Sequence, residues 1–261
     1  MRRSDEDRTL FRPQKYVAFH MLISRWLRGV APGTKYQYVT LGGTELRDVL
    51  HLHFIDPNLV SRVTTFESKA HRSKLAEKAA QDLQKQGLVI RSINGNIFDY
   101  ERDSDEPHIF FFDLPGRFAW SDYEERFARL LQHRTVREGD AVFITSILAR
   151  HSWERVFVTF RGEFNLLEAK DKNSKVRWYR KAHPSFTLYR ALRCAYLEDE
   201  IQMRCIGAVE YRGGGEGGGS ALMGVYGYVV QGGRTEFSEF VADGSVPHFS
   251  EPKARYVVGE E

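Results

Sequence analysis

The stretch KYQYVTLGGTELRDVLHLHFIDPNLVSRVTTFE, residues 35–67, decides the fold of this chain. Its two β-rich runs end on Gly42-Gly43 and on Glu67. Between them, Thr44 is expected to cap a helix, because the apolar residues that follow it recur at roughly helical spacing. This order of strand, glycine turn, helix and strand is typical of doubly wound folds. In such folds the glycines admit a ligand close to the backbone, and the acid accepts hydrogen bonds from ribose hydroxyls.

The rest of the chain continues the alternation of strands and helices. The apolar run IFFF, residues 109–112, fits a central strand that is buried on both faces of a parallel sheet. The last two β-rich runs are joined by a loop too short for a parallel crossover, so they must form an antiparallel hairpin or belong to different sheets. The first helix is expected to pack on the sheet edge. Beyond the helix after Thr44, the patterns predict helices over residues 14–27, 69–86, 123–132 and 185–198, and strands over 36–41, 60–66, 88–93, 109–112, 141–148, 201–211 and 221–230.

Length and composition fit one large α/β domain. The chain has 261 residues, of which 42% are hydrophobic and 13% aromatic, so it can bury a sizeable core. The patterns divide it into an N-terminal arm and helix (1–34), a main domain (35–235) with a basic insertion (150–184), and a tail (236–261). The formal net charge of +3 permits an anionic partner without requiring one.

Several sequence features argue against an oxidising compartment, a membrane span and a metal site. Only two cysteines, Cys194 and Cys205, are present without a CxxC spacing, which favours a reduced, cytoplasmic setting. The sequence shows neither a signal peptide nor a long apolar run, so export and a membrane partner are not expected. His51 and His53 do not share a helix face and have no cysteine or aspartate pattern nearby, so no metal site is expected.

Five alternating strands and helices followed by a hairpin resemble the core of class I S-adenosylmethionine-dependent methyltransferases, over residues 14–230. The resemblance implies an α/β, Rossmann-like seven-stranded mixed sheet, mostly parallel with a C-terminal antiparallel hairpin, and helices on both faces. It also implies S-adenosylmethionine as the cofactor, with its amino-acid part at the glycine turn, its ribose at Glu67 and its adenine amine near Asp99. The implied cofactor-binding residues are Leu41, Gly42, Gly43, Glu45, Glu67, Asn96 and Asp99.

These residues also have plainer interpretations that the sequence leaves open. The glycine turn reads LGGTE instead of the family's GxGxG type of loop, and its glycines could serve only a tight turn. Glu67 could be a surface acid or lie beside a helix N-cap, and Asp99 could be an acid of a turn. Glu45 and Asp48 could face the cofactor or the solvent side of their helix.

Asp113 follows the most apolar strand and is the candidate catalytic residue. A carboxylate at the end of a buried strand is costly unless a ligand or a donor meets it. The segment Asp113-Leu114-Pro115-Gly116 resembles an altered DPPY-type box of methyltransferases that act on amino groups of nucleic acids, but only the acid and the second proline match. That is too little to assign N-methylation. The resemblance implies that Asp113 orients or deprotonates the acceptor beside the reactive methyl and that Pro115 contacts the substrate.

Cationic and aromatic residues favour nucleic acid as the methyl acceptor. The insertion carries Lys175, Trp178 and Tyr179 within a basic run. Phosphate neutralisation and base stacking would combine there, although a solvated basic loop fits the same residues. These three residues are the candidate substrate contacts of the insertion.

One variant of this hypothesis resembles the ribose 2′-O-methyltransferases, which use a Lys-Asp-Lys-Glu tetrad. Lys15, Asp113 and Glu210 lie at comparable places in this chain, with Arg150 in place of the second lysine. The variant requires Lys15, Asp113 and Glu210 to converge on one crevice.

A competing hypothesis is a protein that has kept the methyltransferase fold and lost the chemistry, and that acts as a binding or assembly partner. The incomplete glycine loop and the altered box at 113–116 favour it. A further resemblance is to bacterial proteins that are labelled O-methyltransferase-like and are encoded near defence genes. It rests on the segments YVTLGGTELRDVLHLH and VTTFE, and it implies a fold more than it implies a substrate. A nicotinamide-dependent oxidoreductase is disfavoured by the terminal hairpin and by the absence of GxGxxG. The acceptor atom (O or N), a protein partner and a homo-oligomer stay open.

Overall fold

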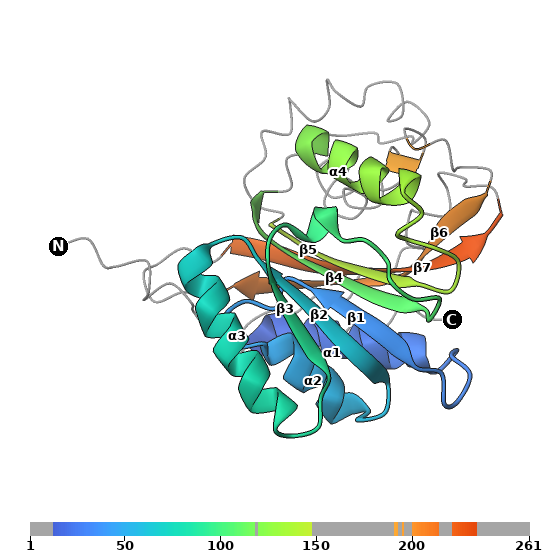
Figure 1. The fold of residues 1–261 in the computed structure, drawn as a ribbon. Helices are drawn as coiled ribbons and strands as arrows, with labels where there is room; N and C mark the ends of the chain where they lie inside the picture. Colours follow the sequence, from blue (N-terminus) through green and yellow to red (C-terminus); the bar gives the residue numbers. More distant parts are fainter. Residues whose placement is uncertain are drawn as a thin grey trace.

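The computed structural model describes residues 13–117, 120–147, 191–192, 195, 200–213 and 221–233 (Figure 1). Their helices are α1 (Pro13–Leu27), α2 (Arg47–Ile55), α3 (Ala70–Gln84), the 3-10 helix η2 (Ile97–Asp99) and α4 (Trp120–Gln132). Their strands are β1 (Tyr36–Thr40), β2 (Val60–Glu67), β3 (Ile90–Asn94), β4 (His108–Arg117), β5 (Ala141–Ile147), β6 (Ile201–Gly213) and β7 (Ala221–Gly232). None of these helices is long and apolar enough to cross a membrane.

The seven strands form one mixed sheet in the order β3-β2-β1-β4-β5-β7-β6. The five strands from β3 to β5 in this order run parallel to one another, whereas β7 pairs antiparallel with both β5 and β6. The sheet that the resemblance to class I methyltransferases implies, with its terminal antiparallel hairpin, is therefore confirmed. Strand order reverses between β1 and β4, and open α/β sheets bind their ligands at the carboxyl ends of such strands.

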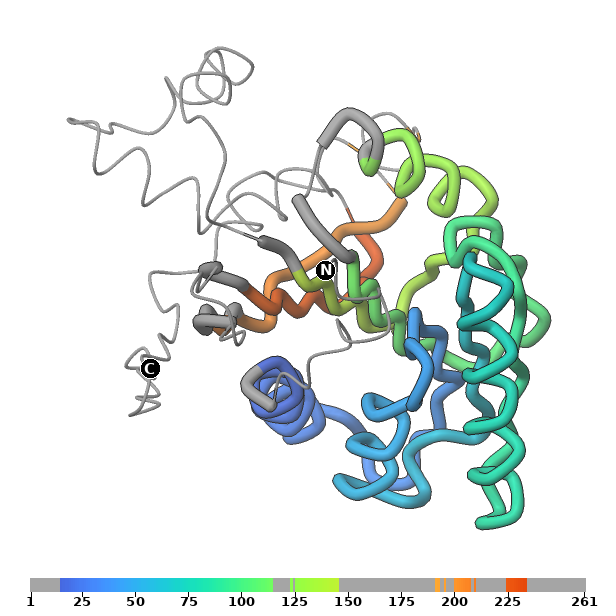
Figure 2. The backbone as a smooth tube through the Cα atoms, turned by 90° about the vertical axis from the view of Figure 1, so that its left-hand side faces the viewer, coloured from blue at the N-terminus to red at the C-terminus, as the bar shows by residue number. Residues whose placement is uncertain are grey.

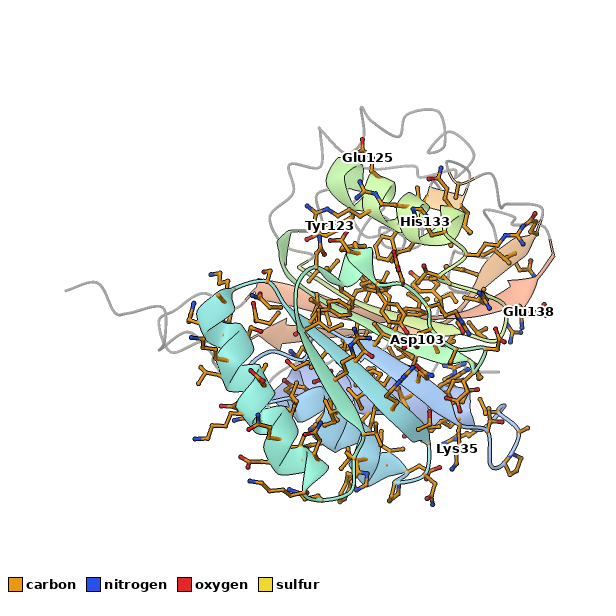
Figure 3. All side chains as sticks on the ribbon, viewed as in Figure 1. Lys35, Asp103, Tyr123, Glu125, His133 and Glu138 are labelled. Carbon is orange, nitrogen blue, oxygen red and sulfur yellow. The ribbon has the colours of Figure 1, made fainter. Side chains whose placement is uncertain are left out.

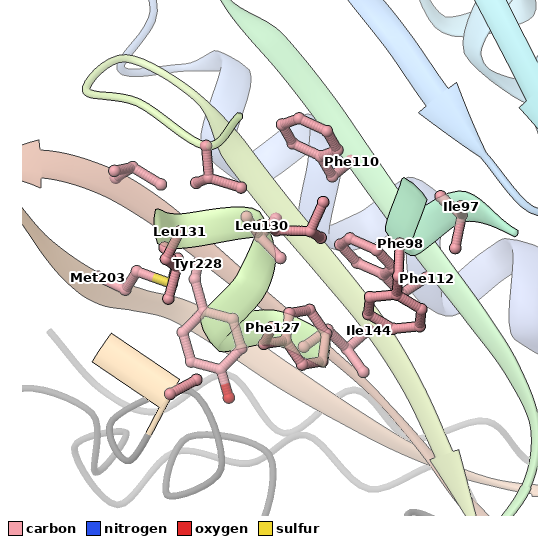
Figure 4. Packing of buried hydrophobic residues seen from close by; sticks show 14 of the residues in the cluster. Ile97, Phe98, Phe110, Phe112, Phe127, Leu130, Leu131, Ile144, Met203 and Tyr228 are labelled. Carbon is pink, nitrogen blue, oxygen red and sulfur yellow. The ribbon is translucent and has the colours of Figure 1, made fainter. Parts of the chain in front are cut away.

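Helices cover both faces of the sheet, and β4 contributes to the core on each side (Figure 1). Phe110 and Phe112 belong to the same buried cluster as Phe127 of α4, and the Phe127 ring meets that of Phe112 edge-on at 4.9 Å (Figure 4). Ile109 and Phe111 point the other way, into the core that α1, α2 and α3 cover. Because side chains alternate along a strand, a continuous apolar run places large residues in both cores. Each such burial contributes roughly 1.5 to 3 kcal/mol.

Helix α1 packs on one face of the sheet, over the strands from β4 to the edge strand β6, so the expectation that it packs on the sheet edge is confirmed only for its contact with β6. Phe19 stacks on Phe111 of β4 with ring centroids 4.2 Å apart and meets Phe143 of β5 edge-on at 5.3 Å. Figure 2 shows α1 (blue) nearly end-on, below the strands β6 and β7 (orange to red). This position brings the first turns of α1 to the end of β4, where Lys15 contacts Asp113.

Two of the differences from the predicted element boundaries bear on the site. Helix α2 begins at Arg47, and Leu46 in a left-handed conformation (φ 49°) occupies its N-cap position, so the prediction that Thr44 caps this helix is wrong. Leu46 is fully buried, and its packing offsets the cost of this backbone conformation. Strand β4 continues past the apolar run to Arg117, with a break in its register with β5 after Asp113.

A buried carboxylate organises the amino ends of β4 and β5. Asp140 has no exposed surface and accepts hydrogen bonds from Arg102 Nη1 at 2.8 Å, the His108 amide at 2.7 Å and the Arg137 amide at 2.8 Å. Burial raises the pKa of Asp140 to about 6, against the opposing effect of Arg102, so the group is ionised at neutral pH. Arg102 is itself only 5% exposed, which makes this a buried ion pair.

The His108 ring completes this buried network. Its Nδ1 lies 2.8 Å from the Glu106 carbonyl oxygen, and its Nε2 lies 2.9 Å from the Tyr100 hydroxyl. Burial, together with Arg102, lowers the pKa of His108 to about 4. The ring is therefore neutral, with Nδ1–H donating to the carbonyl and Nε2 accepting from the tyrosine.

Candidate functional site

The candidate site lies at the carboxyl ends of β1, β2 and β4, where the strand order reverses. Three predicted residues come from these ends: Gly42 follows β1, Glu67 ends β2, and Asp113 lies in β4. The first turns of two helices add Lys15 of α1 and Asp48 of α2. The fold therefore gathers residues from five elements at one place.

Asp113 is held on both of its carboxylate oxygens. Lys15 Nζ donates to Oδ2 at 2.5 Å, and Thr145 Oγ1 of β5 donates to Oδ1 at 2.7 Å. The side chains of Lys15 and Asp113 are 15% and 28% exposed, so this ion pair is partly buried. A charge-assisted hydrogen bond is stronger there than in open solvent. Two donors on different elements thus fix the orientation of the carboxylate.

Lys15 is positively charged at neutral pH. Burial alone would lower its pKa, but Asp113, Tyr16 and Asp48 outweigh burial, and the pKa is raised. Its Nζ also lies 4.6 Å from the centroid of the Tyr16 ring, which stacks on the His51 ring at 5.0 Å. Burial raises the pKa of Tyr16 and lowers the pKa of His51, so both rings beside the ammonium are neutral.

Part of the tetrad hypothesis can be compared with this geometry. Lys15 and Asp113, which the hypothesis requires to converge, are in direct contact. Glu210 belongs to β6. Its neighbour Val209 is in register, across β7, with Thr145 of β5. Thr145 is in turn paired with Asp113 of β4. The side chain of Glu210 lies outside the described part of the chain.

Asp48 is buried against β1, so the solvent-facing orientation that the sequence left open is excluded. It is 3% exposed, and its Oδ2 accepts hydrogen bonds from the Tyr38 hydroxyl at 2.7 Å and from the Thr40 hydroxyl at 2.5 Å. The carboxylate therefore ties the first turn of α2 to the end of β1. The signal that could have found it is the alternation of β1, which places Tyr38 and Thr40 on the same face.

Gly42 and Gly43 shape the turn after β1 for different reasons. A Cβ at Gly42 would lie 2.6 Å from Leu46 Cδ2 and 2.8 Å from Thr65 Oγ1, so close packing excludes a side chain. Gly43 has a left-handed φ of +60°, and a Cβ there would meet no atom within 4 Å. The turn is thus tightly packed at Gly42 and open at Gly43, where a ligand can approach the backbone.

Gly42→Ala is expected to lower the free energy of unfolding by about 1 to 3 kcal/mol, because the new methyl group overpacks Leu46 and Thr65. Gly43→Ala is the matched control, since it collides with nothing and costs only its left-handed conformation, roughly 1 kcal/mol. Urea denaturation of both variants measures the difference. Equal losses would contradict close packing at Gly42.

Glu67 lies at the expected place but has partners within the chain. Its Oε1 accepts from the Lys69 amide at 3.0 Å, and its Oε2 lies 3.8 Å from Arg72 Nε. Lys69 is the N-cap residue of α3, so Glu67 does lie beside a helix N-cap, the plainer interpretation. An ionised carboxylate has about four lone-pair sites, so these contacts leave room for a ligand hydroxyl.

Asn96 and Asp99 lie at the two ends of η2. Asn96 caps this turn by accepting from the Phe98 amide at 3.1 Å, and Asp99 is exposed. Phe98 also belongs to a cluster that sequence reasoning missed: Tyr123 lies 6.0 Å from its ring, and the Arg126 guanidinium lies 5.7 Å and 5.8 Å from the two rings. Figure 3 shows Tyr123 on the side of α4 that faces η2. Tyr123 and Arg126 therefore lie beside Phe98 of η2, the helix that ends at Asp99.

The remaining predicted residues add little to the site. Leu41 packs against the core on the α4 face, and Glu45 is exposed and paired with Arg47. Among the described residues, no group of three or more His, Cys, Asp or Glu gathers that could hold a metal ion. The Pro115 side chain lies outside the described part of the chain, as do the whole residues Arg150, Lys175, Trp178 and Tyr179.

No protein-family model and no curated protein matches this sequence. Among solved structures, an S-adenosylmethionine-dependent methyltransferase from Clostridium acetobutylicum is similar at a TM-score of 0.47 and 9% identity, over 84% of this chain and 92% of that one. Trm5b from Pyrococcus abyssi is similar at 0.46 and 11%, over 85% and 50%. An O-methyltransferase from Bacillus cereus in complex with SAH (S-adenosylhomocysteine) is similar at 0.43 and 13%, over 85% and 83%.

These TM-scores are all below 0.5, and the sequence identities are 13% or less. The fold assignment therefore rests on the strand order of this sheet. The assignment of the site rests on its own geometry.

Proposed function

We propose that this protein is an S-adenosylmethionine-dependent methyltransferase that transfers a methyl group to a hydroxyl acceptor on nucleic acid. The observation that carries the proposal is the contact between Lys15 and Asp113 at the carboxyl end of β4, which Thr145 supports. An ammonium and a carboxylate side by side offer one hydroxyl group both a donor and an acceptor. Both residues lie where the strand order reverses, and open α/β sheets bind their ligands at such a position.

The residues around the glycine turn fit the cofactor. Gly43 leaves open space beside the backbone, Glu67 keeps lone pairs for ribose hydroxyls, and Asp99 has an exposed carboxylate for the adenine amine. When bound, S-adenosylmethionine would supply a methyl group activated by a positively charged sulfur. The main task of the chain is then to align donor and acceptor, which accounts for much of the rate in reactions of this kind.

Lys15 and Asp113 would act on the acceptor hydroxyl. Lys15 is an ammonium at neutral pH, so it donates to the hydroxyl oxygen and does not serve as the base. Asp113 has lone pairs beyond those used by Lys15 and Thr145, and it accepts the hydroxyl proton as the oxygen bonds to the methyl carbon. The transfer would break the bond between that carbon and the sulfur and would leave a neutral thioether.

A ribose hydroxyl of RNA is the first acceptor to test. Contact between Lys15 and Asp113, with β6 bringing the backbone of Glu210 to a nearby row, supports an arrangement similar to that of the ribose 2′-O-methyltransferases. Phosphates and bases would bind to the basic stretch that contains Lys175, Trp178 and Tyr179.

Calorimetric titration with S-adenosylmethionine and S-adenosylhomocysteine tests the cofactor half of the proposal. We expect micromolar binding to the wild type, about −8 kcal/mol. Glu67→Ala is expected to weaken it by at least about tenfold, because the ribose loses its acceptor. Glu77→Ala removes an exposed acid on α3 and is the matched control, with binding unchanged.

Transfer of a labelled methyl group to an oligoribonucleotide tests the acceptor half. Loss of transfer to the 2′-deoxy oligonucleotide would support a ribose hydroxyl. Cofactor binding without transfer to any RNA or DNA would favour the competing binding or assembly role. If the folded wild type binds neither form of the cofactor, the proposal is refuted.

A further inference from the structure

Asp48 carries a buried negative charge with neutral hydrogen-bond partners. It is 3% exposed, and its two donors, the hydroxyls of Tyr38 and Thr40, both contact Oδ2. Burial and the proximity of Asp48 raise the pKa of Tyr38 well above its usual value, so this partner stays uncharged. No described residue donates a hydrogen bond to Oδ1. Hydroxyl donors satisfy part of the carboxylate but do not neutralise it.

The described cations near Asp48 are bound to other acids. Lys15, whose pKa Asp48 helps to raise, donates to Asp113 at 2.5 Å. Arg47, the residue before Asp48, pairs with the exposed Glu45. In the described cluster of Lys15, Asp113 and Asp48, two carboxylates thus face one ammonium, which leaves a net negative charge. Such a charge in a partly buried place is costly unless a cation arrives.

This charge lies against the glycine turn. Asp48 Oδ1 is 3.5 Å from the position that a Cβ would take at Gly42. The proposed function puts the amino-acid part of the cofactor at the same turn. S-adenosylmethionine carries an ammonium and a sulfonium against one carboxylate, so it has a net positive charge. S-adenosylhomocysteine lacks the sulfonium charge and is neutral overall.

We infer that Asp48 makes the cofactor site discriminate by charge, favouring the cationic methyl donor over its neutral product. The inference rests on the proposed function and adds a residue that determines specificity. Because the donor differs from the product by a methyl group and a charge, a nearby uncompensated carboxylate changes their relative affinity. Loss of that attraction after transfer would favour release of the product.

Asp48→Asn isolates the charge, because asparagine keeps the size and its amide oxygen can still accept from Tyr38 and Thr40. Titration of wild type and variant with S-adenosylmethionine and S-adenosylhomocysteine at pH 8 gives the ratio of the product Kd to the donor Kd. We expect Asp48→Asn to lower this ratio by about fivefold or more, mainly through weaker binding of the donor.

Two control variants separate the charge from other roles of the region. Tyr38→Phe removes one hydrogen bond to Asp48 and keeps the charge, so the Kd ratio is expected to stay unchanged. Glu45→Gln removes an exposed acid near the same turn, and screening should hold its effect on the ratio below about twofold.

An unchanged ratio in Asp48→Asn, with both ligands bound, would overturn the inference while the proposed function stands. An equal fall of the ratio in Glu45→Gln would also overturn it. No binding of either ligand to the wild type would refute both the inference and the proposed function. If Asp48→Asn does not fold, titration of the wild type with sinefungin tests the inference instead. Sinefungin is an analogue of the methyl donor that carries an ammonium in place of the sulfonium. It is expected to bind more tightly than S-adenosylhomocysteine, and equal or weaker binding would overturn the inference.

Discussion

Lys15→Met is expected to lower kcat for methyl transfer by at least about 100-fold. Methionine keeps the apolar stem of lysine and removes the ammonium, so that among the described residues only Thr145 still donates to Asp113. The acceptor hydroxyl loses the group that would orient it beside the methyl donor. Because the proposed contact is with the acceptor and not with the cofactor, S-adenosylhomocysteine should bind within about threefold of its wild-type Kd.

Lys35→Met is the matched control for this variant. Lys35 is exposed and lies just before β1, at the amino ends of the parallel strands (Figure 3). Single-turnover transfer to an oligoribonucleotide, with S-adenosylhomocysteine titration in parallel, compares the two variants, and Lys35→Met should react like the wild type. Wild-type transfer by Lys15→Met would contradict the role of Lys15. Loss of S-adenosylhomocysteine binding would instead assign Lys15 to the cofactor site or to the fold.

Most of the fold is predictable because its signals are local. The apolar run at 109–112 marks a strand buried on both faces, and the short connection between β6 and β7 permits only an antiparallel pair within one sheet. The start of α2 is not predictable in this way. Thr44 has the chemistry of a cap, but burial of Leu46 in the core stabilises a left-handed backbone that local preference disfavours.

The candidate site is less predictable, because its contacts join residues that are distant in sequence. Asp113 stands out as an acid at the end of an apolar strand, but the contact with Lys15 was suggested only by resemblance to a tetrad. Helical spacing shows which face of α2 is apolar and does not show that Asp48 meets hydroxyls of β1. Sequence patterns therefore identify strand ends, whereas the donors that fix each carboxylate depend on packing between elements.

Asp140→Asn is expected to lower the free energy of unfolding by about 3 to 5 kcal/mol, the usual result of removing one partner of a buried ion pair. Arg102, which is 5% exposed, would lose its counter-charge. The amides of His108 and Arg137 would compete with it for the single amide oxygen of asparagine, whose NH₂ group would then face a donor. Burial makes each of these losses costly, because water cannot replace the missing acceptor.

Asp105→Asn removes the same charge from an ion pair at the surface and is the matched control. Asp105 pairs with Arg137 at 3.0 Å while its own side chain is 101% exposed, so its replacement should leave the urea midpoint unchanged. Both variants involve Arg137, and they differ mainly in burial. Equal shifts would contradict the buried role of Asp140. The network lies at the amino ends of β4 and β5, away from the proposed cofactor site at the carboxyl ends of β1 and β2, so folded Asp140→Asn should still bind S-adenosylhomocysteine.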